Sequence, residues 1–137
     1  MTSQDKKAYL ERYRESDQEI DHLCEELSRW RARAIRITSD LSHDPLESRE
    51  EERQSKLAVE QIVSLEGQIN AKIDDALRIK HQVEDAIRTV QDGVLREVLT
   101  QRYILCKRWE QIAVDMNYGY RWVLRLHGKA LKLVEVE

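Results

Sequence analysis

Two long stripes of apolar residues constrain the fold of this chain more than any other feature. Their members recur mainly at alternating steps of three and four residues, the spacing that keeps one face of an α-helix apolar. The first stripe comprises Tyr13, Ile20, Leu23, Leu27, Trp30, Ala34 and Ile37, and the second comprises Ile62, Leu65, Ile69, Ile73, Ala76, Val83, Ile87, Val90 and Val94. Each stripe predicts a long helix, and a short connection would fold the two into an antiparallel, coiled-coil-like hairpin.

The expected connection lies around the single proline of the chain. There the segment Asp44-Pro45-Leu46-Glu47 offers a capping aspartate, a proline suited to the first helical position and a glutamate that can reach back to the cap. We therefore expect the second helix to begin there. The next segment, Glu47 to Gln54, has no apolar member, and we expect it to be solvated, frayed or extended beyond its partner.

Asp92 and Gly93 follow the second stripe, where the backbone can bend and Asp92 can cap a further helix. We place a module boundary there, with residues 1–92 as a hairpin for oligomerisation or partner binding and residues 93–137 as a small bundle. If Val94 instead continues the stripe, the long helix would run into the bundle without interruption. With 36% charged residues and no Phe, thin helical cores are expected rather than one large globular core.

The segment Trp109 to Gly128 places its residue types in the order that a DNA-reading helix-turn-helix requires. Asn117-Tyr118-Gly119 supplies a turn between two short helices, since Asn and Gly tolerate a left-handed backbone. The expected internal core consists of Ile112, Ala113, Met116, Tyr118, Val123 and Leu126. The face left free on the second helix consists of Tyr120, Arg121, Leu124, Arg125 and Gly128. A generic helical hairpin with a glycine in its turn would show similar spacing, so that alternative stays open.

The motif is part of a longer pattern that runs from Leu95 to Leu133. The pattern comprises Leu99, Arg102-Tyr103-Ile104, Trp109, Ile112-Ala113, Val123, Leu126-His127 and Ala130-Leu131. With it, about a third of the chain resembles region 4 of bacterial sigma factors, and more closely the small sigma-like proteins of phages and prophages of Gram-positive bacteria. The family usually has a serine at the start of the recognition helix, where this chain has Gly119, which is also an acceptable cap.

The resemblance implies an all-α protein, in which the long hairpin is followed by a three-helix bundle with a helix-turn-helix. It also implies a sequence-specific DNA-binding transcription regulator whose recognition helix, residues 119–134, enters the major groove. The amino-terminal part resembles the phage proteins only in general layout.

Charge is divided unevenly along the chain, although the net charge is only −3. Residues 93–134 hold eight Lys and Arg against three Asp and Glu, a local net charge of +5, so the remainder carries −8. Positive charge on the predicted reading module suits attraction to phosphates, while the acidic remainder would limit binding to arbitrary nucleic acid. Ordinary solvated helix faces remain the alternative explanation.

Motifs for catalysis or metal binding are absent from the sequence, so we expect no enzyme activity, no cofactor and no metal. None of the four histidines has companions at metal-ligand spacing, and His127 is expected to pack near a cap or an aromatic ring. Cys24 and Cys106 lie far apart and are expected to be reduced thiols. Without an apolar run of about 20 residues or a signal-peptide core, we expect a location in the bacterial host cytoplasm, without membrane contact.

In the expected DNA complex, Arg121 and Arg125 lie one helical turn apart and reach guanine edges or phosphates. Tyr120 and Leu124 would contact thymine methyl groups or sugars. Backbone phosphates would be held by Lys107, Arg108, Lys129 and Lys132.

A single module of this kind buries little surface and needs a second reader or another protein to bind tightly. Two arrangements are open: action with RNA polymerase, or a homodimer through the hairpin that binds double-stranded DNA alone. From a different class, the chain would be a structural or oligomeric component, such as a small terminase-like protein of phage DNA packaging. Tyr13 and Trp30 suit either a hairpin core or an interface with a second chain.

Overall fold

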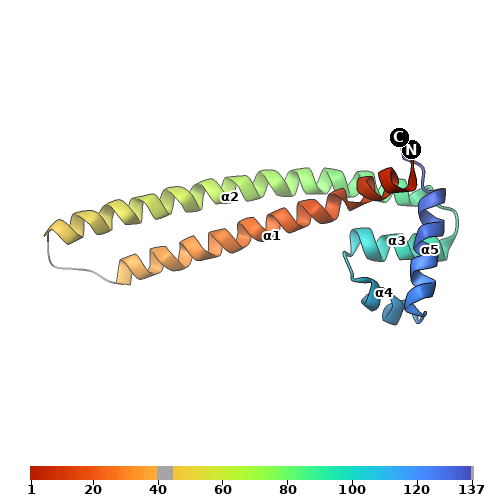
Figure 1. The fold of residues 1–137 in the computed structure, drawn as a ribbon. Helices are drawn as coiled ribbons and strands as arrows, with labels where there is room; N and C mark the ends of the chain where they lie inside the picture. The colour runs from red at the N-terminus through yellow and green to blue at the C-terminus, as the bar shows by residue number, and fades with distance from the viewer. Residues whose placement is uncertain (40–44, 137) are drawn as a thin grey trace. The chain divides into compact units, whose positions relative to one another are not determined.

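The computed structural model describes residues 1–39 and 45–136, and these residues form helices without a strand (Figure 1). In chain order the elements are α1 (Ser3–Ser39), α2 (Pro45–Arg88), α3 (Gly93–Leu99), the π-helix η1 (Thr100–Ile104), α4 (Trp109–Met116) and α5 (Tyr120–Leu133). The predicted all-α class and the two long amino-terminal helices are confirmed. Within these ranges, no helix has the length and apolar character needed to cross a membrane.

The second long helix begins at Pro45, as predicted. Proline suits this position because the first N–H groups of a helix have no intrahelical partner, and proline has no N–H. Glu47 lies in the first turn, whereas the expected capping residue, Asp44, lies outside the described residues. Residues 47–54 are helical and largely exposed, so this segment is a solvated part of α2.

The chain divides into two compact units. The hairpin unit is Gln18–Asp74, and the terminal unit is Met1–Asp17 together with Asp75–Glu137. The start of α1 and the end of α2 therefore belong to one unit with the carboxy-terminal helices. The division of roles that we expect at residue 92 concerns function and stays a prediction.

In the hairpin unit, α1 and α2 pack through the predicted stripes. The buried side chains and the partly buried ones against them are Leu27, Leu65 and Ile69, with Leu23, Trp30 and Ile62. Two ion pairs, Arg31–Glu66 and Lys72–Glu19, join the helices at the surface. Trp30 is thus part of the core. The prediction that Ile73 belongs to the buried face of α2 is wrong. Ile73 is 40% exposed because it lies about 60° around the helix from the buried side.

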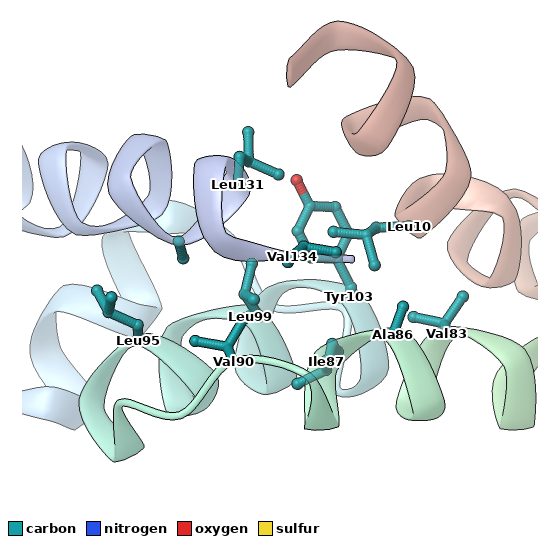
Figure 2. Close-up of a cluster of buried hydrophobic side chains, with 11 residues drawn as sticks. Leu10, Val83, Ala86, Ile87, Val90, Leu95, Leu99, Tyr103, Leu131 and Val134 are labelled. Atoms are coloured by element: carbon teal, nitrogen blue, oxygen red, sulfur yellow. The ribbon is translucent and has the colours of Figure 1, made fainter. Parts of the chain in front are cut away.

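The core of the terminal unit gathers side chains from both ends of the sequence (Figure 2). Its buried members are Leu10, Val83, Ala86, Ile87, Val90, Leu95, Leu99, Tyr103, Ala130, Leu131 and Val134. Leu10 is absent from the predicted first stripe, yet it has no exposed surface. Tyr13 packs against the same cluster, so it belongs to a core. Full burial of a large apolar side chain contributes about 1.5–3 kcal/mol, and this cluster therefore holds α1 to the terminal helices.

α2 ends at Arg88 and α3 begins at Gly93, so the long helix does not continue into the bundle. Asp92 caps α3 as predicted, because one carboxylate oxygen accepts hydrogen bonds from the N–H groups of Val94 at 2.9 Å and Leu95 at 3.1 Å. Val94 therefore lies in the first turn of a new helix and is 42% exposed. The prediction that it completes the apolar stripe is wrong.

The π-helix η1 continues α3 with one wider turn, in which the N–H of Leu105 donates to the carbonyl of Thr100 at 3.0 Å. A π-turn shifts the side chains after it relative to an ordinary α-helix. Here it carries Tyr103, which is completely buried in the terminal core. The chain then turns through Cys106, whose backbone is left-handed with φ 57°.

Candidate nucleic-acid interface

A tight turn joins α4 to α5, and its backbone explains the choice of residues. Asn117 is left-handed, with φ 59°, which asparagine tolerates better than most residues. Its N–H donates to the carbonyl of Val114 at 3.1 Å, and that of Tyr118 donates to Ala113 at 3.0 Å, which together form a Schellman motif. Gly119 has an extended backbone and is the N-cap of α5, the role that the sequence suggests for it.

A small core holds α4, α5 and α3 together. It comprises the buried side chains of Val98, Ile112, Ala113 and Val123, with Trp109, Met116 and Leu126 packed against them. The predicted core is confirmed except at Tyr118, which is 38% exposed. Helical spacing does not apply to Tyr118, because α4 has already ended at Met116.

The solvent side of α5 carries four positive side chains, which we call the α5 basic stripe. They are Arg121, Arg125, Lys129 and Lys132. All four are exposed, and at 100° per residue they fall within an arc of about 80°. The opposite side of the helix is buried through Val123, His127, Ala130 and Leu131. Among the described residues, none of the four side chains enters an ion pair.

The other members of the predicted α5 face lie at its edge. Tyr120 is 45% exposed and begins the helix, while Leu124 is half-buried. Gly128 is exposed at the edge of the α5 basic stripe, and the space where a Cβ would stand is open. On the predicted face, no side chain therefore covers the helix backbone at position 128, between Arg125 and Lys132 along the chain.

Lys107 and Arg108 precede α4 and have different surroundings. The Lys107 ammonium donates to the carboxylate of Asp115 at 2.8 Å and to the side-chain oxygen of Gln101 at 3.4 Å. Hydrogen bonds from Lys107 and Gln111 hold the pKa of Asp115 below its ordinary value. Arg108, in contrast, is exposed at the N-cap of α4. The charge of Lys107 is therefore largely compensated within the protein, whereas Arg108 is free to bind an anion.

Behind the α5 basic stripe, His127 joins three elements of the terminal unit. Its Nε2 shares a 2.6 Å hydrogen bond with the hydroxyl of Tyr103 in η1, and its ring lies edge-on to Trp109 of α4 at 4.5 Å. The guanidinium of Arg102 lies 4.6 Å from the Trp109 ring. Burial, with the charges of Lys7 and Arg102, lowers the pKa of His127 to about 4, so the imidazole is neutral near pH 7. The expectation that His127 packs against an aromatic ring is confirmed.

The structure adds exposed aromatic and apolar residues that the sequence pattern did not single out. Trp122 is 50% exposed on α5, and Val114 is 73% exposed on α4. Both lie off the buried faces of their helices. For Trp122 the helical period gave no clear signal, because position 122 lies 100° around the helix from Val123 but only 40° from Leu126.

No protein-family model, curated protein or solved structure matches the chain. The chemistry of the site therefore rests on its own residues. The described ranges hold no cluster of His, Cys, Asp or Glu suited to a metal ion. In the described residues, α5 and the N-cap of α4 carry cations without an ion pair, beside hydroxyl and apolar groups. Groups of this kind have the chemistry to contact phosphates through charge and hydrogen bonds.

Proposed function

We propose that this protein is a sequence-specific DNA-binding transcription regulator of phage or prophage type, without catalytic activity. α4 and α5 form its helix-turn-helix, and α5 is the recognition helix that enters the major groove. The observation that carries the proposal is the α5 basic stripe, whose charges are free and project from a helix fixed by a buried core. The resemblance to sigma region 4 supports the same assignment.

Each side chain has a role that follows from its place. Arg121 and Arg125 read guanine edges or hold phosphates, since a guanidinium can donate two parallel hydrogen bonds. Tyr120 and Leu124 contact thymine methyl groups or sugars. Backbone phosphates are bound by Arg108, Lys129 and Lys132, and the compensated Lys107 contributes least.

The protein acts in the cytoplasm of the bacterial host, together with RNA polymerase in the manner of a sigma region 4. A dimer that binds DNA alone is the other arrangement. Both supply the additional contacts that one small helix-turn-helix lacks, because such a module buries a modest surface.

Fluorescence anisotropy with a labelled random duplex, at rising salt, tests the proposal. Affinity should fall steeply with salt, because binding releases the counterions of several phosphates. The double variant Arg121→Ala/Arg125→Ala should lose about 1–3 kcal/mol for each arginine that reads a base, and less for a phosphate contact. Arg29→Ala/Arg49→Ala is the matched control, since it removes the same charge from exposed positions of α1 and α2 and should leave affinity nearly unchanged.

Absence of salt-dependent binding would reject DNA recognition, and equal losses in the two double variants would reject α5 as the reading helix. If binding is observed, selection of bound sequences from random duplex would identify the DNA sequence that the protein recognises.

A second candidate function is an oligomeric component, such as a small terminase-like protein of DNA packaging. It is favoured by large apolar side chains exposed on α2, among them Val59, Val63 and Leu77. Light scattering coupled to size exclusion separates the candidates, because a ring of many subunits would support packaging and a monomer or dimer would support regulation.

A further inference from the structure

α2 carries a second apolar row, which α1 does not cover. Val59 is 53% exposed, Val63 is 62%, Ile73 is 40% and Leu77 is 51%. At 100° per residue these positions fall within an arc of about 80°, which lies about 100° around the helix from the buried side. Two polar residues, Glu66 and Asn70, fill the gap in the row. We call the six residues the α2 outer seam.

Their spacing is that of a coiled-coil contact. The steps along the α2 outer seam are four, three, four, three and four residues, so the row follows the a and d positions of a heptad. In a four-helix arrangement each helix has two contact directions at about a right angle. α1 occupies one direction of α2 in the hairpin, and the α2 outer seam marks a second one.

The order of residues along the seam is complementary to itself. If a second copy of α2 runs antiparallel, with Val63 facing the second copy's Ile73, the same register places Val59 against Leu77 and Glu66 against Asn70. On each side of the polar centre, one apolar layer then pairs Val63 with Ile73 and the next pairs Val59 with Leu77. At the centre, the Asn70 amide can donate to the Glu66 carboxylate, once in each direction, while one oxygen of that carboxylate keeps its 3.0 Å ion pair with Arg31 of α1. A parallel pairing would instead bring the two Glu66 carboxylates together, which is unfavourable.

Gly67 lies beside the centre of this register. It is exposed in the interior of a long helix, and nothing lies within 4 Å of where its Cβ would stand. Glycine is among the weakest helix formers, so such a position needs a reason other than the stability of α2 itself. Gly67 lies about 80° around α2 from the middle of the α2 outer seam, so its missing side chain leaves room at the edge of the contact between the two copies.

We propose that the α2 outer seam is the interface of an antiparallel homodimer, with Glu66 and Asn70 setting its register. The dimer would form through this one face of α2, with the two copies running in opposite directions, whether or not the protein binds DNA. A buried polar pair at such positions fixes register at a cost in stability, so the dimer should exchange with monomer as concentration falls.

Analytical ultracentrifugation over about two orders of magnitude in protein concentration tests the interface. The wild type should pass from monomer to dimer, and Val63→Glu/Ile73→Glu should weaken the dimer at least about 100-fold, because it places two facing carboxylates in the layer on each side of the polar centre. Both residues are exposed, so the variant should keep its helical circular dichroism. The matched control is Leu57→Glu, an apolar residue 49% exposed on the other side of α2, which should dimerise like the wild type. A wild type that stays monomeric, or a dimer weakened equally by Leu57→Glu, would overturn the proposal.

Disulfide trapping tests the direction of pairing, in a background where the exposed Cys24 is replaced by Ser. Chains with Val63→Cys and chains with Ile73→Cys should cross-link to each other under oxidation when mixed, but neither should cross-link to itself. Disulfides require Cα atoms within about 7 Å, so the pattern reports register directly. Self-linked Val63→Cys chains would show a parallel pair and overturn the antiparallel assignment. Because neither experiment contains DNA, their failure would leave the proposed reading helix untouched, and failure of the anisotropy experiment would leave the dimer untouched.

Discussion

Lowering the pH from about 7 to about 4.5 should destabilise the protein through His127. The side chain is 8% exposed, and burial, with the charges of Lys7 and Arg102, lowers its pKa from 6.5 to about 4 in the folded state. The unfolded chain therefore binds this proton at a higher pH than the folded chain does. As the pH falls through this window, protonation favours the unfolded state, and the free energy of unfolding decreases.

The magnitude follows from the difference between the two pKa values. One pKa unit corresponds to about 1.4 kcal/mol, so the full window from 6.5 to about 4 corresponds to about 3 kcal/mol. Roughly 2 kcal/mol of that is lost by pH 4.5. Hydrogen bonds lower the pKa values of Asp5 and Asp115 below 3.8. The free energy of unfolding that depends on these two carboxylates is therefore lost mainly below the pH range in which His127 is protonated.

Urea denaturation followed by circular dichroism, repeated across this pH range, measures the effect. His127→Phe keeps a ring against Trp109 but binds no proton, so its free energy of unfolding should lose this part of the pH dependence. The variant should also be about 1–3 kcal/mol less stable near pH 7, because the buried Tyr103 hydroxyl loses its partner. His22→Phe, at an exposed position, should retain the wild-type slope. Equal slopes in the wild type and His127→Phe would refute the reasoning.

Three further substitutions probe the fold around the site, each by urea denaturation. Leu10→Ala should cost about 2–5 kcal/mol because Leu10 is fully buried, and a loss under about 1 kcal/mol would argue against packing of α1 on the terminal helices. Asp92→Ala should cost about 1 kcal/mol by removing the cap of α3, and Asp92→Asn should recover most of it. Gly128→Ala should raise the free energy of unfolding by up to about 1 kcal/mol, because a Cβ has open space there; a decrease would contradict a free solvent side of α5.

The sequence predicted those parts of the fold that depend on neighbouring residues. The start of α2 at Pro45, the cap at Asp92 and the turn at Asn117 each follow from backbone preferences within a few positions. Burial of Leu10 and Tyr103 could not be predicted in this way. Helical spacing identifies an apolar face but not the distant segment that covers it, and the π-turn that carries Tyr103 alters that spacing.

The same distinction applies to the candidate site. Exposure of Arg121 and Arg125 follows from the helical period once Val123 is placed inward. The pairing of Lys107 with Asp115 does not, because one residue precedes α4 and the other lies within it. A sequence lists both charges, but only the fold determines which cation is compensated and which is free.

This distribution of charge explains why α5 keeps a free positive side. Residues 93–134 contain three carboxylates, and two of them are already engaged: Glu97 accepts a 2.8 Å hydrogen bond from Gln101, and Asp115 binds Lys107. The third, Glu110, lies in the first turn of α4, where a negative charge is stabilised by the helix dipole. No carboxylate of this segment therefore pairs with Arg121, Arg125 or Lys129, and their charges stay available to an external anion. Reversing this with Gly128→Glu should place a carboxylate between Arg125 and Lys132 and weaken binding to a random duplex. Leu57→Glu, which adds the same charge to an exposed position of α2 outside the α2 outer seam, should not.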